Sequence, residues 1–134
     1  MTDEQISTMT GPELSQAIAE AMGWRLEPYW GADKEPAWVD AEGRWKCWPA
    51  HLPSPSTNWS HWGLVYEFMV GEGWWAQIWM MPEITRWAWC KGGFKGHGIA
   101  YVEEHDPDLR TASVKAALKA LWMREGRFDS GMGL

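Results

Sequence analysis

Thirteen tryptophans are the feature that most constrains the fold of this chain. They occur in 134 residues that hold only three Tyr and three Phe. Full burial of one indole ring contributes on the order of 4 to 6 kcal/mol, so these rings dominate any core. Thirteen such rings are difficult to hide in one small core, and each buried indole N–H needs an acceptor. We therefore expect most Trp side chains in the core and a few on an exposed binding surface.

The remaining composition limits the number of domains and the class of partner. A chain of this length fits one domain, which needs neither metals nor disulfides for stability. Twelve Lys and Arg against eighteen Asp and Glu give a net charge of −6, which disfavours binding to a nucleic-acid backbone. Without a secretion signal or an apolar run long enough to span a membrane, we expect a cytoplasmic protein. Cys47 and Cys90 show no metal or redox spacing and are expected to be buried free thiols.

Three segments have the pattern of helices. The first begins at a capping box at Thr10 to Glu13 and ends at Gly23. The second begins near Asn58, carries an apolar stripe and ends at Gly71 to Gly73. The third follows Asp106 to Asp108, has an alanine-rich face and ends at Gly126.

The strand signals lie between these helices. Residues 74–81 alternate with period two and are apolar on both faces, and residues 84–91 and 97–103 follow as two further strands. A hairpin is predicted from residues 38–39 and 44–48 around the turn Asp40 to Gly43, after an irregular connection at 24–36. Consecutive strands joined by short turns are expected to pair antiparallel.

A central strand with two apolar faces needs cover on both sides, and helices are the available cover. The expected fold is therefore α+β, a three-layer αβα sandwich with a small antiparallel sheet covered by helices. We place this single domain at residues 10–126, with a flexible lead-in at 1–9 and a loose tail at 127–134.

Three segments also carry a family resemblance. Leu14 to Trp24, "LSQAIAEAMGW", Ser54 to Asn58 before the second helix, and Ala112 to Leu121, "ASVKAALKAL", resemble the phage ABA sandwich domain family of small phage and prophage proteins. The resemblance covers roughly residues 12–124. It implies an αβα sandwich encoded by a bacteriophage, and it brings no set of catalytic residues with it.

The polar residues show no pattern of catalysis or cofactor binding. The four histidines, His51, His61, His97 and His105, lack the short spacing of zinc ligands, so no metal is expected. The glycine-rich loop Lys91 to Gly96 lacks the spacing of a phosphate loop, and no nucleophile elbow is present. We therefore expect neither a cofactor nor enzymatic activity.

One aromatic segment is the candidate binding site. It leads from the hairpin through a proline-rich loop into the second helix, and an Arg and two His accompany its rings. Its residues are Trp38, Arg44, Trp45, Trp48, His51, Trp59, His61 and Trp62. The first hypothesis is a non-enzymatic phage accessory protein that binds a host protein or itself through exposed Trp. The alternative is a protein that binds or sequesters a small planar ligand such as a nucleotide and so counters host defence.

Overall fold

The computed structural model describes residues 3–9, 11–32, 34–47, 59–92 and 99–124. Within these ranges the chain forms four helices and six strands, and the strands make two antiparallel three-stranded sheets. The expected α+β class and the antiparallel pairing of consecutive strands are confirmed. No helix in these ranges is both long enough and apolar enough to cross a bilayer.

Two helices end in the same way, and both lead into a strand. In α2 (Gly11–Ala21) the N–H of Trp24 bonds the carbonyl of Ala19, and Gly23 has a φ of +81°. In α3 (Trp59–Gly71) the N–H of Trp74 bonds the carbonyl of Met69, and Gly73 has a φ of +93°. This is a Schellman motif, which needs a left-handed residue after the last turn. The first two predicted helices are thus confirmed, while Thr10 lies outside the described residues.

The larger sheet has the order β4-β5-β6. Its strands are β4 (Trp75–Met80), β5 (Thr85–Gly92) and β6 (Ile99–Asp106). β4 and β5 pair from Trp75 opposite Cys90 to Met80 opposite Thr85, and a tight turn at Pro82 and Glu83 joins them. The strand at the centre of this sheet is therefore β5.

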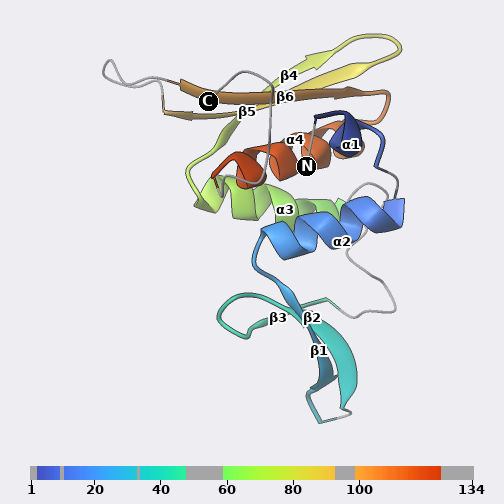
Figure 1. Cartoon of the computed structure of the whole chain (residues 1–134), viewed down its shortest axis with the longest axis vertical. Helices are drawn as coiled ribbons and strands as arrows, with labels where there is room; N and C mark the ends of the chain where they lie inside the picture. Colours follow the sequence, from blue (N-terminus) through green and yellow to red (C-terminus); the bar gives the residue numbers. More distant parts are fainter. Residues whose placement is uncertain (1–2, 10, 33, 48–58, 93–98, 125–134) are drawn as a thin grey trace.

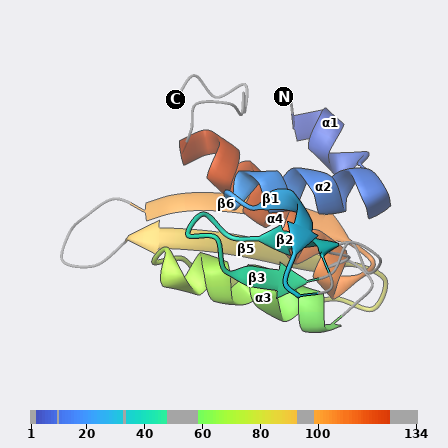
Figure 2. The same ribbon diagram turned by 90° about the horizontal axis from the view of Figure 1, so that it is seen from below.

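Helices cover one face of this sheet. α4 (Leu109–Arg124) packs across β5 and β6, with α3 on one side of it and α2 and α1 on the other (Figures 1 and 2). Trp87 and Trp89 of β5 point toward these helices, and both are about 1% exposed. The described residues therefore form helical cover on one face, and the second helical layer expected for a sandwich is not among them.

The expectation that residues 74–81 form a hidden central strand is wrong. Among the strands that the structure describes, β4 takes the edge of its sheet, and Ile78 and Met80 are 46% and 78% exposed. Apolar residues on both faces made the strand look buried, but that pattern does not reveal which neighbours a strand has. β5 takes the central position, where its two Trp rings pack against α3 and α4.

α4 is the central helix of the fold. It begins after Asp108, whose carboxylate accepts a hydrogen bond from the N–H of Thr111 at 3.0 Å, as the predicted cap requires. Sequence patterning indicated one apolar face, whereas every residue from Ala112 to Trp122 is buried. α4 is enclosed because the sheet, α2 and α3 all pack against it.

The N-terminal residues are part of this packing. Residues 1–9 were expected to form a flexible lead-in, but Asp3–Ser7 form the short helix α1. Ile6 is fully buried, and the carbonyl of Ser7 accepts a hydrogen bond from Lys115 of α4 at 2.7 Å. One apolar residue in a short segment gives no periodicity, which is why the pattern did not indicate a helix.

The smaller sheet lies below the helices in Figure 1. Its strands, in the order β1-β2-β3, are β1 (Arg25–Trp30), β2 (Glu35–Val39) and β3 (Trp45–Cys47). The predicted hairpin is confirmed, with Gly43 at a φ of +82°. The predicted irregular connection at 24–36 is wrong, because β1 pairs with β2 there. β1 contains a proline and leaves Leu26 and Tyr29 exposed, so it lacks the alternation that marks a half-buried strand.

Some of the buried indole N–H groups donate to an acceptor in the described structure, and others do not. Ser113 of α4 accepts from two of them, at its hydroxyl from Trp62 and at its carbonyl from Trp89. The indole N–H groups of Trp38, Trp74 and Trp87 are buried and have no acceptor within the described ranges. The expectation that each buried indole finds a partner thus holds for some of the rings in the described structure.

Candidate functional site

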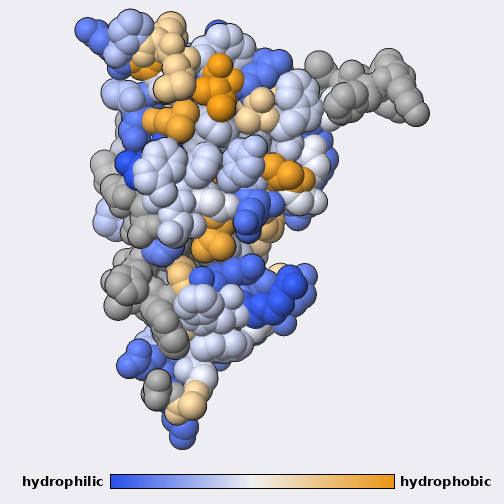
Figure 3. Space-filling model, turned by 180° about the vertical axis from the view of Figure 1, so that it is seen from behind, coloured by the Kyte–Doolittle hydropathy of each residue, from blue (hydrophilic) through white to orange (hydrophobic). Residues whose placement is uncertain are grey.

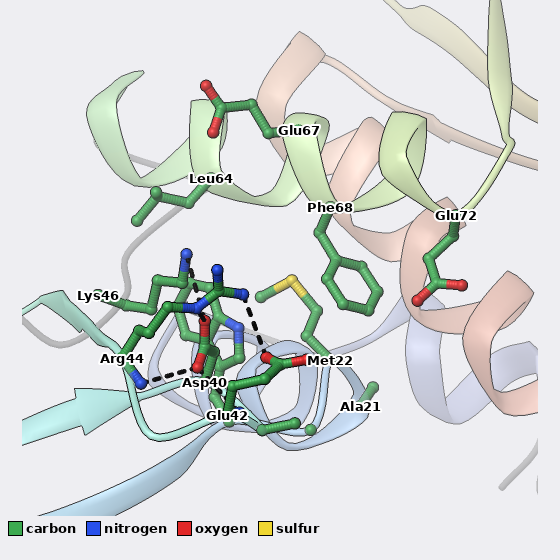
Figure 4. Close-up of a pocket in the computed structure, with 13 residues that line it drawn as sticks. Ala21, Met22, Asp40, Glu42, Arg44, Lys46, Leu64, Glu67, Phe68 and Glu72 are labelled. Atoms are coloured by element: carbon green, nitrogen blue, oxygen red, sulfur yellow. Dashed lines mark hydrogen bonds and ion pairs between the residues drawn. The ribbon is translucent and has the colours of Figure 1, made fainter.

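A pocket of about 400 Å³ lies between the hairpin turn of the smaller sheet and the helices (Figure 4). The end of α2, the β2–β3 turn and one side of α3 form its walls. Its lining residues are Ala21, Met22, Gly23, Trp24, Asp40, Ala41, Glu42, Arg44, Lys46, Leu64, Glu67, Phe68 and Glu72.

Asp40 organises the hairpin side of this pocket. Its carboxylate accepts hydrogen bonds from the backbone N–H of Arg44 at 2.8 Å and from the Arg44 guanidinium at 2.9 Å. Burial alone would raise the pKa of Asp40, but these bonds outweigh it and hold the pKa below its ordinary value. Lys46 lies 3.7 Å from the same carboxylate, and Arg44 also pairs with Glu42 at 3.2 Å. Both cations of the pocket are therefore already matched by carboxylates of the same turn.

The rest of the pocket is an apolar surface with an acidic rim. In Figure 4, Phe68 and Leu64 point from α3 toward the hairpin, and Met22 lies beside Phe68. Glu67 and Glu72 add two carboxylates on the α3 side. This arrangement can hold a small molecule with an apolar body, and no group of three His, Cys, Asp or Glu in the described part of the chain is placed to bind a metal.

The structure separates the eight residues predicted as one binding segment. Trp38 is 2% exposed in the core, whereas Trp45 is 44% exposed on β3. Arg44 lies on the pocket rim. Trp48 and His51 lie outside the described residues.

The other three residues lie together at the start of α3. Trp59 is 57% exposed. Its ring meets that of Trp62 edge to face, with the ring centroids 5.3 Å apart, and the guanidinium carbon of Arg110 lies 4.5 Å from the centroid of the Trp59 ring. Trp62 is half-buried and donates its indole N–H to the hydroxyl of Ser113 at 2.6 Å. His61 is buried. Only Trp59 of these three offers a largely exposed ring.

A larger exposed apolar surface joins Trp59 to the β4 edge. We call it the β4–α3 surface and define it as Trp59, Tyr66, Val70, Ile78, Met80 and Met81, all more than a third exposed. Figure 3 shows exposed hydrophobic groups on the side of the molecule opposite the view of Figure 1. Sequence patterning missed most of this surface, because it assigned Tyr66 and Val70 to a buried stripe and the β4 residues to a hidden strand.

Ring contacts show that the two parts of this surface are neighbours. The ring centroids of Trp62 in α3 and Trp87 in β5 are 6.0 Å apart, and Trp87 lies opposite Ile78 of β4 in the sheet register. The ring centroids of Tyr66 and Trp89 are 5.7 Å apart, and Trp89 lies two pairs further along the same strands, opposite Ala76. α3 therefore lies along the β4 side of the sheet, and its exposed aromatic residues border the open edge.

The opposite face of the sheet has a different character. Arg86 forms an ion pair with Glu103 and donates a hydrogen bond to the hydroxyl of Tyr101. Its guanidinium carbon lies 4.3 Å from the centroid of the Trp79 ring. Burial would raise the pKa of Glu103, but hydrogen bonds from Tyr101 and Arg86 hold it below its ordinary value. Arg86 thus has its partners on this face within the molecule. This face carries an ion pair, whereas β4 itself carries no charged residue.

Comparison with known proteins gave no relatives: no family model, no curated protein and no solved structure matches this chain.

Proposed function

We propose that this protein is non-enzymatic and acts by binding a protein chain through the β4–α3 surface. The observation that supports the proposal best is the open edge of β4, which carries no charged residue from Trp74 to Pro82. Native edge strands are usually protected by charges, bulges or cover. An uncharged, exposed edge bordered by aromatic residues is typical of a surface that a partner covers.

The chemistry of this surface favours a protein over a small molecule. An edge strand offers a row of backbone N–H and C=O groups, which an extended segment of another chain satisfies by adding a strand. Trp59 and Tyr66 add aromatic rings with polar edges, the side chains that contribute most at protein interfaces. A small ligand would leave most of this long, open surface in contact with water.

The biological setting of the proposal depends on the family resemblance. It is that of a phage accessory protein in the cytoplasm of the host cell, where the partner is a host protein or a second copy of the chain. Exposed Trp was the expected means of binding, and Trp59 is the residue of the predicted segment that lies on the β4–α3 surface.

Site-specific photo-crosslinking tests the proposal. A benzoyl-phenylalanine is placed at Met80 in one variant and at Tyr29 in a control, and the protein is irradiated inside the expressing cell. The two positions are matched in exposure, at 78% and 75%, but Tyr29 lies on the smaller sheet. We expect a discrete covalent adduct with a chain identified by mass from position 80 alone. Equal adducts from both positions, or none from position 80, would contradict the proposal.

The pocket supports a second candidate, the binding of a small planar ligand. Its volume of about 400 Å³ lies within the usual range for ligand sites, and Trp24 and Phe68 line it. A ligand in contact with Trp24 should quench tryptophan fluorescence when nucleotides are titrated into the protein, and a Phe68→Ala variant should weaken the quenching. Unchanged fluorescence across the titration would argue against this candidate.

A further inference from the structure

The register of the sheet determines which backbone groups of β4 face the open edge. The N–H of Met81 bonds the carbonyl of Ile84 at 3.0 Å, so residues 81 and 84 form a hydrogen-bonded pair. Hydrogen-bonded and non-hydrogen-bonded pairs alternate along an antiparallel ladder. Ile78 opposite Trp87 and Met80 opposite Thr85 are therefore non-hydrogen-bonded pairs. The backbone N–H and C=O groups of Ala76, Ile78 and Met80 point away from β5, toward the open edge.

Ala76 and Met80 lie two residues before and two residues after Ile78. If a second copy of β4 adds antiparallel to the first with Ile78 opposite itself, Ala76 lies opposite Met80 of the second copy and Met80 opposite its Ala76. All the outward backbone groups of the strand then find partners in one ladder. A two-fold axis perpendicular to the sheet passes between the two Ile78 residues, and both copies keep their helices on the same face.

The side chains on β4 also suit pairing with an identical strand. A charge near a two-fold axis faces its own copy, so it repels. No charged residue occurs from Trp74 to Pro82, so no like charges would meet along these two strands. The register about Ile78 sets the small Ala76 against the long Met80 on the helix face, and Gln77 against Trp79 on the other face. A symmetric partner disfavours a charge at position 78, because that residue faces its own copy, whereas a hetero-partner could oppose such a charge with one of the other sign.

We infer that the partner of the β4 edge is a second copy of this chain, joined through β4 in an antiparallel pair centred on Ile78. This inference rests on the proposed function, because it names the chain that covers the β4–α3 surface. The product is a continuous six-stranded sheet, β6-β5-β4 followed by the same strands of the second copy. Tyr66 contacts Trp89 on the helix face, near the seam, and its exposed part gains cover there.

Light scattering of the purified chain tests the inference. The expected mass is twice the chain mass of 15.4 kDa. Ile78→Lys and Ile78→Glu should each give monomers, because like charges then meet on the axis. Mixing the two variants should restore the dimer, because Lys then faces Glu. Tyr29→Lys, at a more exposed position on the smaller sheet, should leave the dimer intact. A monomeric wild-type chain, or a dimer that survives Ile78→Lys, would overturn the inference.

Cysteine crosslinking tests the register separately. Residues opposite each other in a hydrogen-bonded pair have Cα atoms about 5.5 Å apart, which a disulfide spans. Under mild oxidation, Ile78→Cys should give a covalent dimer. Met80→Cys is the matched control on the same face, because Met80 and its copy would be separated by about 13 to 14 Å along the strands. A Met80→Cys dimer as abundant as that of Ile78→Cys would overturn the register, and the circular dichroism of each variant reports folding.

The two experiments separate this inference from the proposed function. If the chain is monomeric but position 80 crosslinks to a different protein, the self-pairing is wrong and binding through the β4–α3 surface stands. If the chain is monomeric and position 80 gives no adduct, both are wrong.

Discussion

The ammonium group of Lys119 lies against the carboxylate of Glu104, and both side chains are nine-tenths or more buried. The pair joins the central helix α4 to β6. The hydroxyl of Ser7 in α1 donates to the same carboxylate at 2.9 Å, and Lys115 lies 3.5 Å from Asp106 one turn away. Two lysines and two acids thus match one another where α1, α4 and β6 meet.

Replacing one partner of this pair should destabilise the protein strongly. We expect Lys119→Met to lower the free energy of unfolding by about 3 to 5 kcal/mol, because it leaves the Glu104 carboxylate buried and uncompensated. Urea denaturation measures the loss. Lys34→Met, at an exposed turn position, is the control and should change stability little. The double variant Lys119→Met/Glu104→Leu should recover most of the loss. If its change in unfolding free energy equals the sum of the changes in the two single variants, the pair is not coupled.

Ser113 should couple α3 to α4 through Trp62. Ser113→Ala removes the hydroxyl that accepts the Trp62 indole N–H, and we expect a loss of about 1 to 2 kcal/mol. Trp62→Phe removes the donor. A double-mutant cycle measured by chemical denaturation should show a coupling between the two changes, and strict additivity would contradict the hydrogen bond.

Two glycines at the end of α3 should respond in opposite directions to the same change. Gly73→Ala places a side chain at a φ of +93°, which we expect to cost about 1 kcal/mol or more. Gly71 lies within the helix, and an added Cβ meets nothing within 4 Å. Gly71→Ala should therefore be neutral or stabilise by up to about 1 kcal/mol. Thermal unfolding of the two variants checks this, and equal shifts would rule out the Schellman ending.

The buried thiols should react slowly in the folded protein. Burial raises the pKa of Cys47 to about 11 from 9.0 and also raises that of Cys90. A raised thiol pKa contributes stability below pH 9, and this contribution is lost as the pH rises toward about 11. We expect both thiols to be protected from Ellman's reagent at pH 8 and released by urea. Rapid modification of the folded protein would show that they are accessible.

The sequence predicted the helices well and the environment of the strands poorly. Gly23, Gly73 and Asp108 are local signals that need no knowledge of neighbours, so α2, α3 and α4 were placed near their observed bounds. The hairpin around Gly43 was predicted for the same reason. β1 was missed because the structure gives it no alternating burial.

The position of a strand in its sheet is a long-range property. Trp74 to Pro82 and Thr85 to Cys90 are similarly apolar, and only the pairing of β5 with β6 decides that β4 takes the edge. For the same reason Trp38 was expected at a binding site but lies in the core, while Met80 was expected in a covered strand but is exposed. Burial of Lys119 follows from contacts with β6, which periodicity within α4 cannot reveal.

Hydrogen exchange of the Ile78 amide tests the central claim most directly, because this N–H is inferred to face the open edge of β4. Its exchange rate is measured by NMR in dilute protein and at about a hundredfold higher concentration, since self-association follows mass action. We expect exchange to slow as the concentration rises, in step with the amides of Ala76 and Met80. An Ile78 amide that exchanges at the same fast rate throughout would contradict pairing of the β4 edge.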